Sequence, residues 1–387
     1  MSRSMNKKAN QSTGGRSARV VYKRIVVKAG TGVLTLEGDR LDIAHLRQLV
    51  GQIASLHREG IQIILVSSGA IAAGKDILGE VEIDHDIPFR QVLAALGQSY
   101  LMDSYQRLFN EHGIRVAQVL LTRKDVSDRQ GYLNVRNTLL QLIDLGAIPI
   151  VNENDVVAVE EIGEGFGDND TLSALVSNIV DSEMLLMLTD TEGLYTKDPQ
   201  DKDARLIQTV ERVDESIEAL ASDYHKPWSR GGMATKLEAA KNACASGTTT
   251  VVCNGRLKDI IYRVVSGEQI GTRFLSTATK LESRKRWLLS CLSVNGEILI
   301  DDGAAIALSS KKKSLLPAGI QGIGGEFSRG DVVYIISLEG KQLACGIANY
   351  DSQDIVRIKG GPSKHIVKIL GHQYGEAVVH RNNMVLL

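Results

Sequence analysis

Two hydrophobic patterns alternate along the first 275 residues of the chain. Short apolar runs have the length of buried strands, and between them apolar residues recur every three or four positions, as on one face of a helix. Strands are predicted at Val21–Lys28, Ile61–Val66, Ile114–Leu121, Ala147–Val151, Met184–Leu188 and Thr249–Cys253. Helices are predicted from Asp42, a candidate N-cap, to Leu56, and at Phe89–Glu111, Arg129–Leu145, Asp170–Val180 and Ala234–Ala245. This order predicts an α/β fold with a mostly parallel sheet between layers of helices.

The pattern changes after Gly271. Residues 276–286 are polar and poor in apolar side chains, which is typical of a linker. From 287 to 387, short apolar runs separated by Gly-rich turns predict a small, mainly β domain. The first 20 residues are polar and basic and lack the apolar stretch of a secretory signal, so we predict a disordered tail. The α/β domain is then expected at 21–275.

Composition argues against several classes of protein. The 45 basic and 46 acidic residues nearly cancel, so the chain does not have the charge of a dedicated nucleic-acid binder. No apolar run approaches the 18 residues or so needed for a membrane helix. The four cysteines form no C-x-x-C pair and no cluster with histidine, so we expect reduced thiols, no zinc site and a cytoplasmic protein.

Polar and glycine residues follow several of the predicted strands directly. Lys28, Gly30 and Gly32 follow the first strand, Ser67 to Gly74 follow the second, and Asn152 to Asp155 follow the fourth. Because the carboxyl ends of parallel strands meet at one edge of a sheet, these turns should face one crevice. Gly-rich turns let backbone N–H groups approach a phosphate, and amide and carboxylate side chains suit a small polar substrate. Taken singly, each of these turns is also compatible with an ordinary turn or a helix cap.

Three further motifs belong to the same domain. Residues 166–175 place Asp168, Asn169 and Asp170 beside glycines, where capping accounts for only one of the three side chains. Thr189 and Asp190 follow the fifth strand, and this segment is by composition only a loop. Lys236 comes early in a helix after two glycines, where the helix dipole disfavours a cation unless it serves an anion. Together the six motifs suit phosphoryl transfer by positioning and charge neutralisation.

The order of these motifs resembles that of the glutamate 5-kinases, a branch of the amino acid kinase family. The segments that carry the resemblance are VVKAGTGVLT, LVSSGAIAAG, LLTRKD, VNENDVVA, GDNDTLSALVS, LTDTEGLYTKDP and GGMATKLEAA. The later segments LESRKRW, SLLPAGI, FSRGDVV and YGEAVVHRNNM resemble a PUA domain. The resemblance runs from about Arg24 to the C-terminus. It implies a three-layer sandwich around a mostly parallel sheet, followed by a PUA domain.

The resemblance also implies roles for individual residues. Lys28 and Lys236 would flank the transferred phosphoryl group, and Asp170 would hold both lysines. Glutamate would be bound by Ser68, Asn152, Asp155, Asp168 and Asn169. ATP would be bound by Lys28, Gly30, Thr189, Asp190, Gly231, Gly232, Met233, Ala234, Thr235 and Lys236. Mg²⁺ would arrive with ATP, and no protein metal site is expected. Inhibition by proline and a homo-oligomer built through the kinase domain are further implications.

Two positions depart from the family pattern, and two alternatives stay open. Gly32 stands where a serine is common, and Arg230 stands where a small residue is usual, so the ATP site near Arg230 is not settled by sequence. Another amino acid kinase, acting on aspartate, N-acetylglutamate, carbamate or UMP, would share the lysines and glycines. An RNA-binding protein is suggested by the tail domain alone, but its few aromatic residues argue against RNA as a partner.

Overall fold

A computed structural model describes residues 22–36, 40–79, 87–127, 129–158, 169–222, 232–276, 279 and 296–387. Its N-terminal part contains an eight-stranded sheet in the order β5-β6-β4-β1-β7-β9-β10-β8. The strands are β1 (Arg24–Ala29), β4 (Gln62–Ser67), β5 (Val116–Leu121), β6 (Ile148–Glu153), β7 (Met184–Thr189), β8 (Thr209–Val210), β9 (Thr249–Asn254) and β10 (Thr272–Phe274). From β5 to β9 all neighbours are parallel, and β10 is antiparallel to β9. The predicted, mostly parallel sheet is confirmed.

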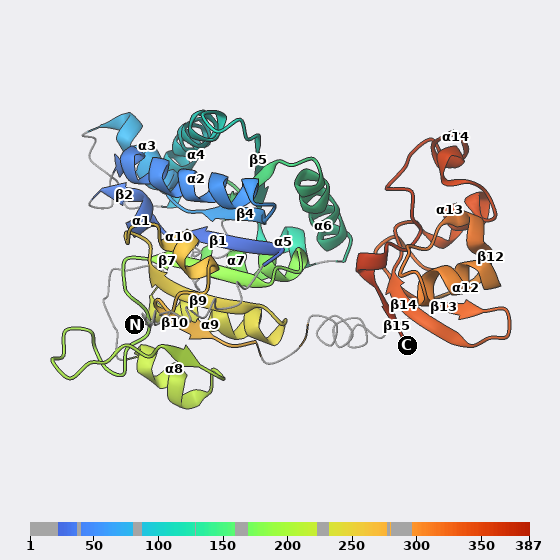
Figure 1. The fold of residues 1–387 in the computed structure, drawn as a ribbon. Coiled ribbons are helices and arrows are strands. Elements are labelled where there is room, and N and C mark those ends of the chain that lie inside the picture. The colour runs from blue at the N-terminus through green and yellow to red at the C-terminus, as the bar shows by residue number, and fades with distance from the viewer. Residues whose placement is uncertain are drawn as a thin grey trace, which may run out of the picture.

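Helices cover both faces of this sheet (Figure 1). One layer contains α2 (Ile43–Arg58), α3 (Ala70–Leu78), α4 (Ile87–Asn110) and α10 (Ile260–Val265). The other contains α6 (Arg129–Asp144), α7 (Asn169–Ile179), α8 (Glu215–Ser222) and α9 (Met233–Ala245). In β1, Ile25 and Val27 pack into the first layer and Val26 into the second. The strands are continuously apolar because both faces are buried, and the three-layer sandwich is confirmed.

Local contacts explain where these helices begin and how closely they pack. The Asp42 carboxylate accepts a hydrogen bond from the backbone N–H of His45, so the expected N-cap of α2 is present. The helices α3 and α4 are in backbone contact through glycines. A Cβ atom added at Gly74 would lie 2.0 Å from the Leu93 carbonyl oxygen, and one at Gly97 would lie 1.8 Å from the Ala70 carbonyl oxygen. This contact fixes α3, which begins just after the Ser67–Gly69 turn.

The C-terminal part has its own sheet and its own core. Its strands follow the order β12-β11-β13-β14-β15 and are mostly antiparallel. They are β11 (Gly296–Ile300), β12 (Ile320–Gly324), β13 (Val332–Ser337), β14 (Gln342–Ile347) and β15 (Met384–Leu386). Three short helices that the sequence pattern did not indicate accompany them, namely α12 (Asp302–Ser309), α13 (Ser352–Ile358) and α14 (Ile366–Leu370). The first two are N-capped by Asp301 and Asp351.

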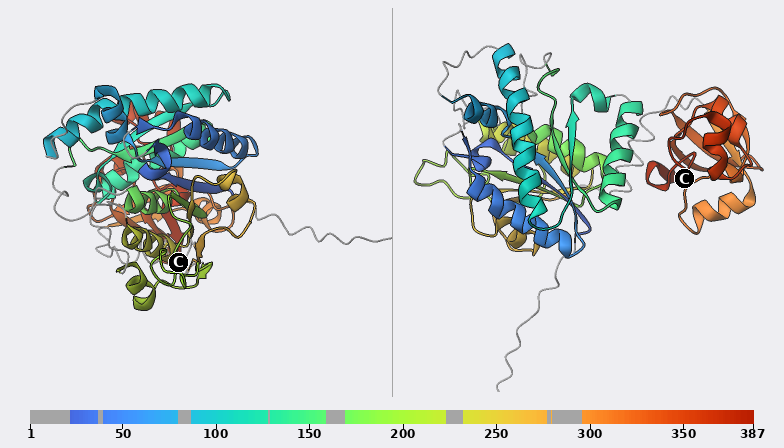
Figure 2. Two further views of the ribbon diagram at one scale, coloured as in Figure 1. Left: turned by 90° about the vertical axis from the view of Figure 1, so that its left-hand side faces the viewer. Right: turned by 90° about the horizontal axis from the view of Figure 1, so that it is seen from above.

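The C-terminal part lies beside helix α6 (Figures 1 and 2). Leu133 of α6 is fully buried in a small cluster with Val332, Cys345, Ile347 and Val385. None of the described helices is long and apolar enough to cross a membrane. The predicted tail lies outside the described residues, as does most of the predicted linker, including all of 280–286. The described cysteines, at 244, 253 and 345, are buried and unbridged.

Candidate active site

The polar motifs predicted from sequence meet at one edge of the large sheet. Because β1, β4, β6 and β7 are parallel neighbours, their carboxyl ends lie side by side. Lys28 is paired with Val66 on one side and with Met187 on the other, just before the three strands end. The described parts of the motifs therefore line one site, as the strand order requires.

A buried cluster of three charges stands at the centre of this edge. The Lys28 ammonium lies 2.6 Å from Oδ1 of Asp170, and the Lys236 ammonium lies 3.0 Å from Oδ2 of the same carboxylate. The hydroxyl of Thr235 donates to Oδ2 at 3.0 Å. Asp170 is fully buried, and the two lysines are 4% and 6% exposed. One carboxylate therefore positions two ammonium groups from opposite ends of the domain's sequence.

Asp170 belongs to the first turn of α7, and Lys236 to the first turn of α9. Asp170 does not cap its helix, because its carboxylate faces the lysines. A carboxylate is favourable near a helix N-terminus and an ammonium is not, so Asp170 offsets the unfavourable position of Lys236. Lys236 is buried and is therefore not a solvated surface residue. The cluster carries a net positive charge, which suits an anionic ligand.

The glycine turn after β1 is held against the neighbouring strand. The backbone N–H of Gly30 donates to the Leu188 carbonyl at 3.1 Å, and a Cβ atom at this position would lie only 3.4 Å from the Lys28 ammonium. The next residues form a short helix, α1 (Thr31–Leu34), that the sequence pattern did not indicate. Arg256, from the segment after β9, donates to the carbonyls of Gly32 and Thr35. These bonds fix the turn beside the lysines.

A hydrogen-bonded group of amides and hydroxyls lies on the other side of Asp170. The Asn169 side-chain amide donates to Ser68 Oγ at 2.9 Å and to Asn152 Oδ1 at 3.0 Å. The Asn152 amide donates in turn to Gln98 Oε1 at 2.8 Å. Asn169 Oδ1 is buried and accepts no hydrogen bond within the described part of the chain. Consecutive residues of α7 thus serve two halves of the site: Asn169 faces the amides, and Asp170 faces the lysines.

Asp155 lies just beyond the end of β6, in the turn that follows Asn154. Burial raises the pKa of its carboxyl above the usual value, and the positive charge of Arg90 opposes this shift. The Gln91 amide donates to the Asp155 carbonyl at 3.1 Å and so ties the turn to α4. A half-buried carboxylate at this position offers an acceptor for a ligand ammonium group.

Some of the remaining predicted residues are described by the structure, and the others are not. Thr189 ends β7, and its hydroxyl donates to the exposed carboxylate of Asp190 at 3.0 Å, on the side of the glycine turn. Gly232 precedes α9, Ala234 is exposed in its first turn, and the Met233 side chain is buried in the core. Asp168, Gly231 and Arg230 lie outside the described residues.

Two residues that hold the site were missed by sequence reasoning. Gln98 lies within α4, where a polar residue at helical spacing gives no sign of a partner. Arg256 follows Asn254 at the end of β9, so its position after a strand end was a usable signal. Among the described residues, no group of three histidine, cysteine or acidic side chains is placed to hold a metal ion.

Comparison with known proteins assigns the chain to a family. The model of the amino acid kinase family matches residues 23–254, and that of the PUA domain matches residues 296–370. The chain belongs to the amino acid kinase family. The glutamate 5-kinase of Dehalococcoides mccartyi strain CBDB1 is 50% identical over 368 residues, which cover 95% of this chain and 99% of that one. The glutamate 5-kinase of Caldanaerobacter subterraneus subsp. tengcongensis is 44% identical over 94% of this chain and 98% of its own.

Both relatives thus extend across the amino acid kinase part and the PUA part of this chain. The glutamate 5-kinase of Shewanella halifaxensis, 44% identical over 371 residues, covers 96% of this chain and 99% of its own. A crystal structure of UMP kinase from Bacillus anthracis shares 18% identity and a TM-score of 0.45, covering 66% of this chain and 97% of that one. Membership in the family and the presence of a PUA domain agree with the resemblance in the sequence motifs.

Proposed function

We propose that this amino acid kinase transfers the γ-phosphoryl group of ATP to the side-chain carboxylate of L-glutamate and forms L-glutamyl 5-phosphate, the first step of proline synthesis. The observation that carries the proposal is the buried contact of Lys28 and Lys236 with Asp170 at the edge of the sheet. Relatives that match this chain over nearly their full length, and that are named glutamate 5-kinase, support the same proposal.

The chemistry follows from the charges at this edge. The γ-carboxylate of glutamate is ionised at neutral pH, so it attacks the γ-phosphorus without a general base. A bond forms between a carboxylate oxygen and phosphorus, and the bond from phosphorus to the oxygen of ADP breaks. The Lys28 and Lys236 ammonium groups neutralise the charge that develops on the phosphoryl oxygens. Asp170 keeps both ammonium groups in place and reduces their mutual repulsion.

Glutamate would occupy the side of the site that contains the amides. Ser68, Asn152 and Asn169 supply hydroxyl and amide groups. The Asn169 Oδ1, which accepts no hydrogen bond from the described residues, is an acceptor for the substrate ammonium. Asp155 supplies a carboxylate for the same ammonium. We assign Asp168 to this group from its place in the motif alone. An acyl phosphate is labile to water, so the bound product must be shielded from solvent until it is released.

ATP would occupy the side with the glycine turn. Gly30, Thr189, Asp190 and the segment 231–236 are assigned to it, with Lys28 and Lys236 at the γ-phosphate. Mg²⁺ would arrive with ATP and would supply charge neutralisation on the phosphate oxygens.

The localisation, assembly and inhibition of the protein are proposed from the family resemblance. We propose a cytoplasmic homo-oligomer that assembles through the kinase domain and is inhibited by proline. We assign the kinase domain to 21–275, the linker to 276–286 and the PUA domain to 287–387.

The test measures acyl phosphate directly. The purified protein is incubated with MgATP and glutamate, and the product is trapped with hydroxylamine as a hydroxamate. Aspartate, N-acetylglutamate, carbamate and UMP are offered in parallel, with ADP release as the readout. We expect turnover with glutamate, and preferential turnover of another acceptor would refute the proposal.

Variants of the lysines test the mechanism. Lys28→Met and Lys236→Met keep the length of the side chain and remove its charge, so each should lower kcat about 10²- to 10³-fold. Lys241→Met is a matched control, because Lys241 lies on the same helix as Lys236 but is exposed and pairs with Glu218. Normal turnover in folded Lys28→Met and Lys236→Met proteins would overturn the assigned roles.

A further inference from the structure

Arg136 is the largest fully buried side chain among the described residues, and it lies far from the charge cluster. Its Nε donates to Asn383 Oδ1 at 2.7 Å. One terminal nitrogen donates to Asp181 Oδ2 at 2.6 Å and to the Asn382 carbonyl at 3.1 Å, and the other donates to the Ile179 carbonyl. Burying a guanidinium costs several kcal/mol unless it is paired, so this side chain needs all of these partners in place.

These partners join two parts of the chain. Asn382 and Asn383 precede the last strand of the C-terminal domain, whereas Ile179 is the last residue of α7 and Asp181 lies in the turn just after it. The last carbonyls of a helix have no partner within the helix, and a cation beside them is favourable. Arg24 of β1 donates to the next carbonyl, that of Val180. Two arginines therefore hold the C-terminal end of α7.

The other end of α7 carries Asn169 and Asp170. The helix has 11 residues and is about 16 Å long at 1.5 Å per residue. A helix transmits an axial shift from one end to the other, because its length is fixed by backbone hydrogen bonds. The position of Asp170 therefore depends on where the end of the helix at Ile179 is held.

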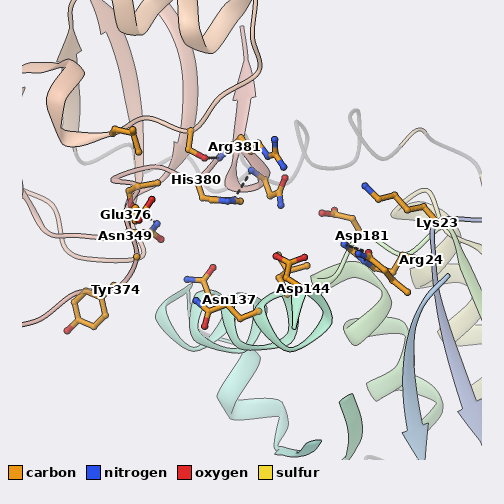
Figure 3. A pocket seen from close by; sticks show the side chains of 18 of the residues that line it. Lys23, Arg24, Asn137, Asp144, Asp181, Asn349, Tyr374, Glu376, His380 and Arg381 are labelled. Atoms are coloured by element: carbon orange, nitrogen blue, oxygen red, sulfur yellow. Dashed lines mark hydrogen bonds between the residues drawn. The ribbon is translucent and has the colours of Figure 1, made fainter. Parts of the chain in front are cut away.

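The junction of the two domains is only partly packed, so each polar contact contributes more to holding the domains together. A cavity of about 600 Å³ lies between the domains beside the contacts of Arg136, and Arg24, Asp181 and His380 are among its lining residues (Figure 3). Asn382, which accepts from Arg136, also lines it. The domains also meet through Leu133 and its apolar neighbours, through the ion pair of Arg129 with Asp331 at 3.6 Å, and through Arg329, which donates to Asn134 Oδ1 at 2.6 Å. Those contacts hold the C-terminal domain without touching α7.

We propose that Arg136 is a positioning residue for phosphoryl transfer, and that Asn382 and Asn383 of the C-terminal domain hold its guanidinium in place. The C-terminal domain thereby contributes to the placement of Asp170 without reaching the site. This inference rests on the proposed kinase function. A displacement of about 1 Å in a reacting group costs up to about 100-fold in rate, so a loosened α7 should lower kcat.

Substitutions at Asn383 test this proposal most directly. Asn383→Ala removes the acceptor of the Arg136 Nε bond. Asn383→Asp keeps that acceptor and sacrifices no bond, because the Asn383 amide nitrogen has no partner within the described residues. Asn134→Ala is the control: it breaks another interdomain hydrogen bond of the same helix, two residues from Arg136. Arg136→Lys keeps the charge but cannot reach all four acceptors.

The experiment compares kcat and KM in the hydroxamate assay with hydrogen exchange of the amides in α7. We expect Asn383→Ala and Arg136→Lys to lower kcat about tenfold, with KM for ATP and glutamate within about twofold. Asn383→Asp should restore kcat, Asn134→Ala should leave it unchanged, and exchange should rise in α7 but not in α9. Normal kcat in folded Asn383→Ala protein, or an equal loss in Asn134→Ala, would overturn the proposal.

The two proposals fail in different ways. If the unmodified protein phosphorylates no glutamate, the proposed function fails, and the exchange measurement still reports on α7. If glutamate is phosphorylated and α7 exchanges alike in Asn383→Ala and in the unmodified protein, only the positioning role fails. Should Arg136→Lys not fold, the pair Asn383→Ala and Asn383→Asp decides the matter.

Discussion

Asp170→Asn is the most direct perturbation of the charge cluster. The asparagine has the shape of the aspartate but no charge, so two buried ammonium groups lose the carboxylate that each contacts, at 2.6 and 3.0 Å. Removing one partner of a buried ion pair costs about 3–5 kcal/mol, because the other charge stays buried without compensation. With two cations on one anion we expect a value near the upper end. A stability loss of that size lowers the folding equilibrium constant about 10²- to 10⁴-fold.

The loss is measured by urea unfolding followed by circular dichroism, at constant salt. Asp203→Asn is the control, since Asp203 is an exposed carboxylate of the same domain and should change stability by less than about 0.5 kcal/mol. Saturating ATP analogue should restore part of the stability of Asp170→Asn, because the phosphates supply the missing negative charge. If Asp170→Asn loses less than about 1 kcal/mol, the lysines do not depend on this carboxylate and the argument is refuted.

Two further variants test the packing and the pH dependence. Gly97→Ala forces a methyl group onto the Ala70 carbonyl and should lower the free energy of unfolding by about 1–3 kcal/mol or more. Its control is Gly51→Ala, in open space on α2, which should raise that free energy by about 0.5–1 kcal/mol. Thermal melting compares the two variants. Asp155→Asn should raise the KM for glutamate. Because burial raises the pKa of Asp155, its ionisation opposes folding, so the variant should be more stable near pH 7, a gain that disappears below the ordinary aspartate pKa of about 3.9. A lower urea midpoint for the variant at neutral pH would contradict that sign.

The large sheet was predictable because its strands are buried on both faces. Such strands are continuously apolar, so runs like Ile61–Val66 stand out between helical segments. Parallel strands also place their carboxyl ends together, which is why the described motif residues meet. The encounter of Lys28 with Lys236 was expected from this rule and from the family resemblance, and the structure contains it. The roles of these residues stay proposals.

Other features left no trace in the local pattern. The helices α12, α13 and α14 have five to eight residues, which is too short for a helical repeat to be visible. Arg136 shares the face of α6 that buries Leu133 and Leu139, but a charged residue there gives no sign of its partner Asn383, 247 residues away. Gln98 is likewise an ordinary polar position of α4 until the fold brings Asn152 beside it. Contacts of this kind come from tertiary structure and not from periodicity.

The distance in sequence between the two active-site lysines has a consequence for synthesis. Lys28 lies on the first strand to emerge from the ribosome, and Lys236 emerges 208 residues later. At about 5–20 residues per second, Lys236 is synthesised roughly 10–40 s after Lys28. Asp170 is translated between them, so Lys28 can acquire its counterion before the second ammonium arrives. Without α9, the Lys28–Asp170 pair has no net charge, and the positive charge of the site arises only when Lys236 joins it.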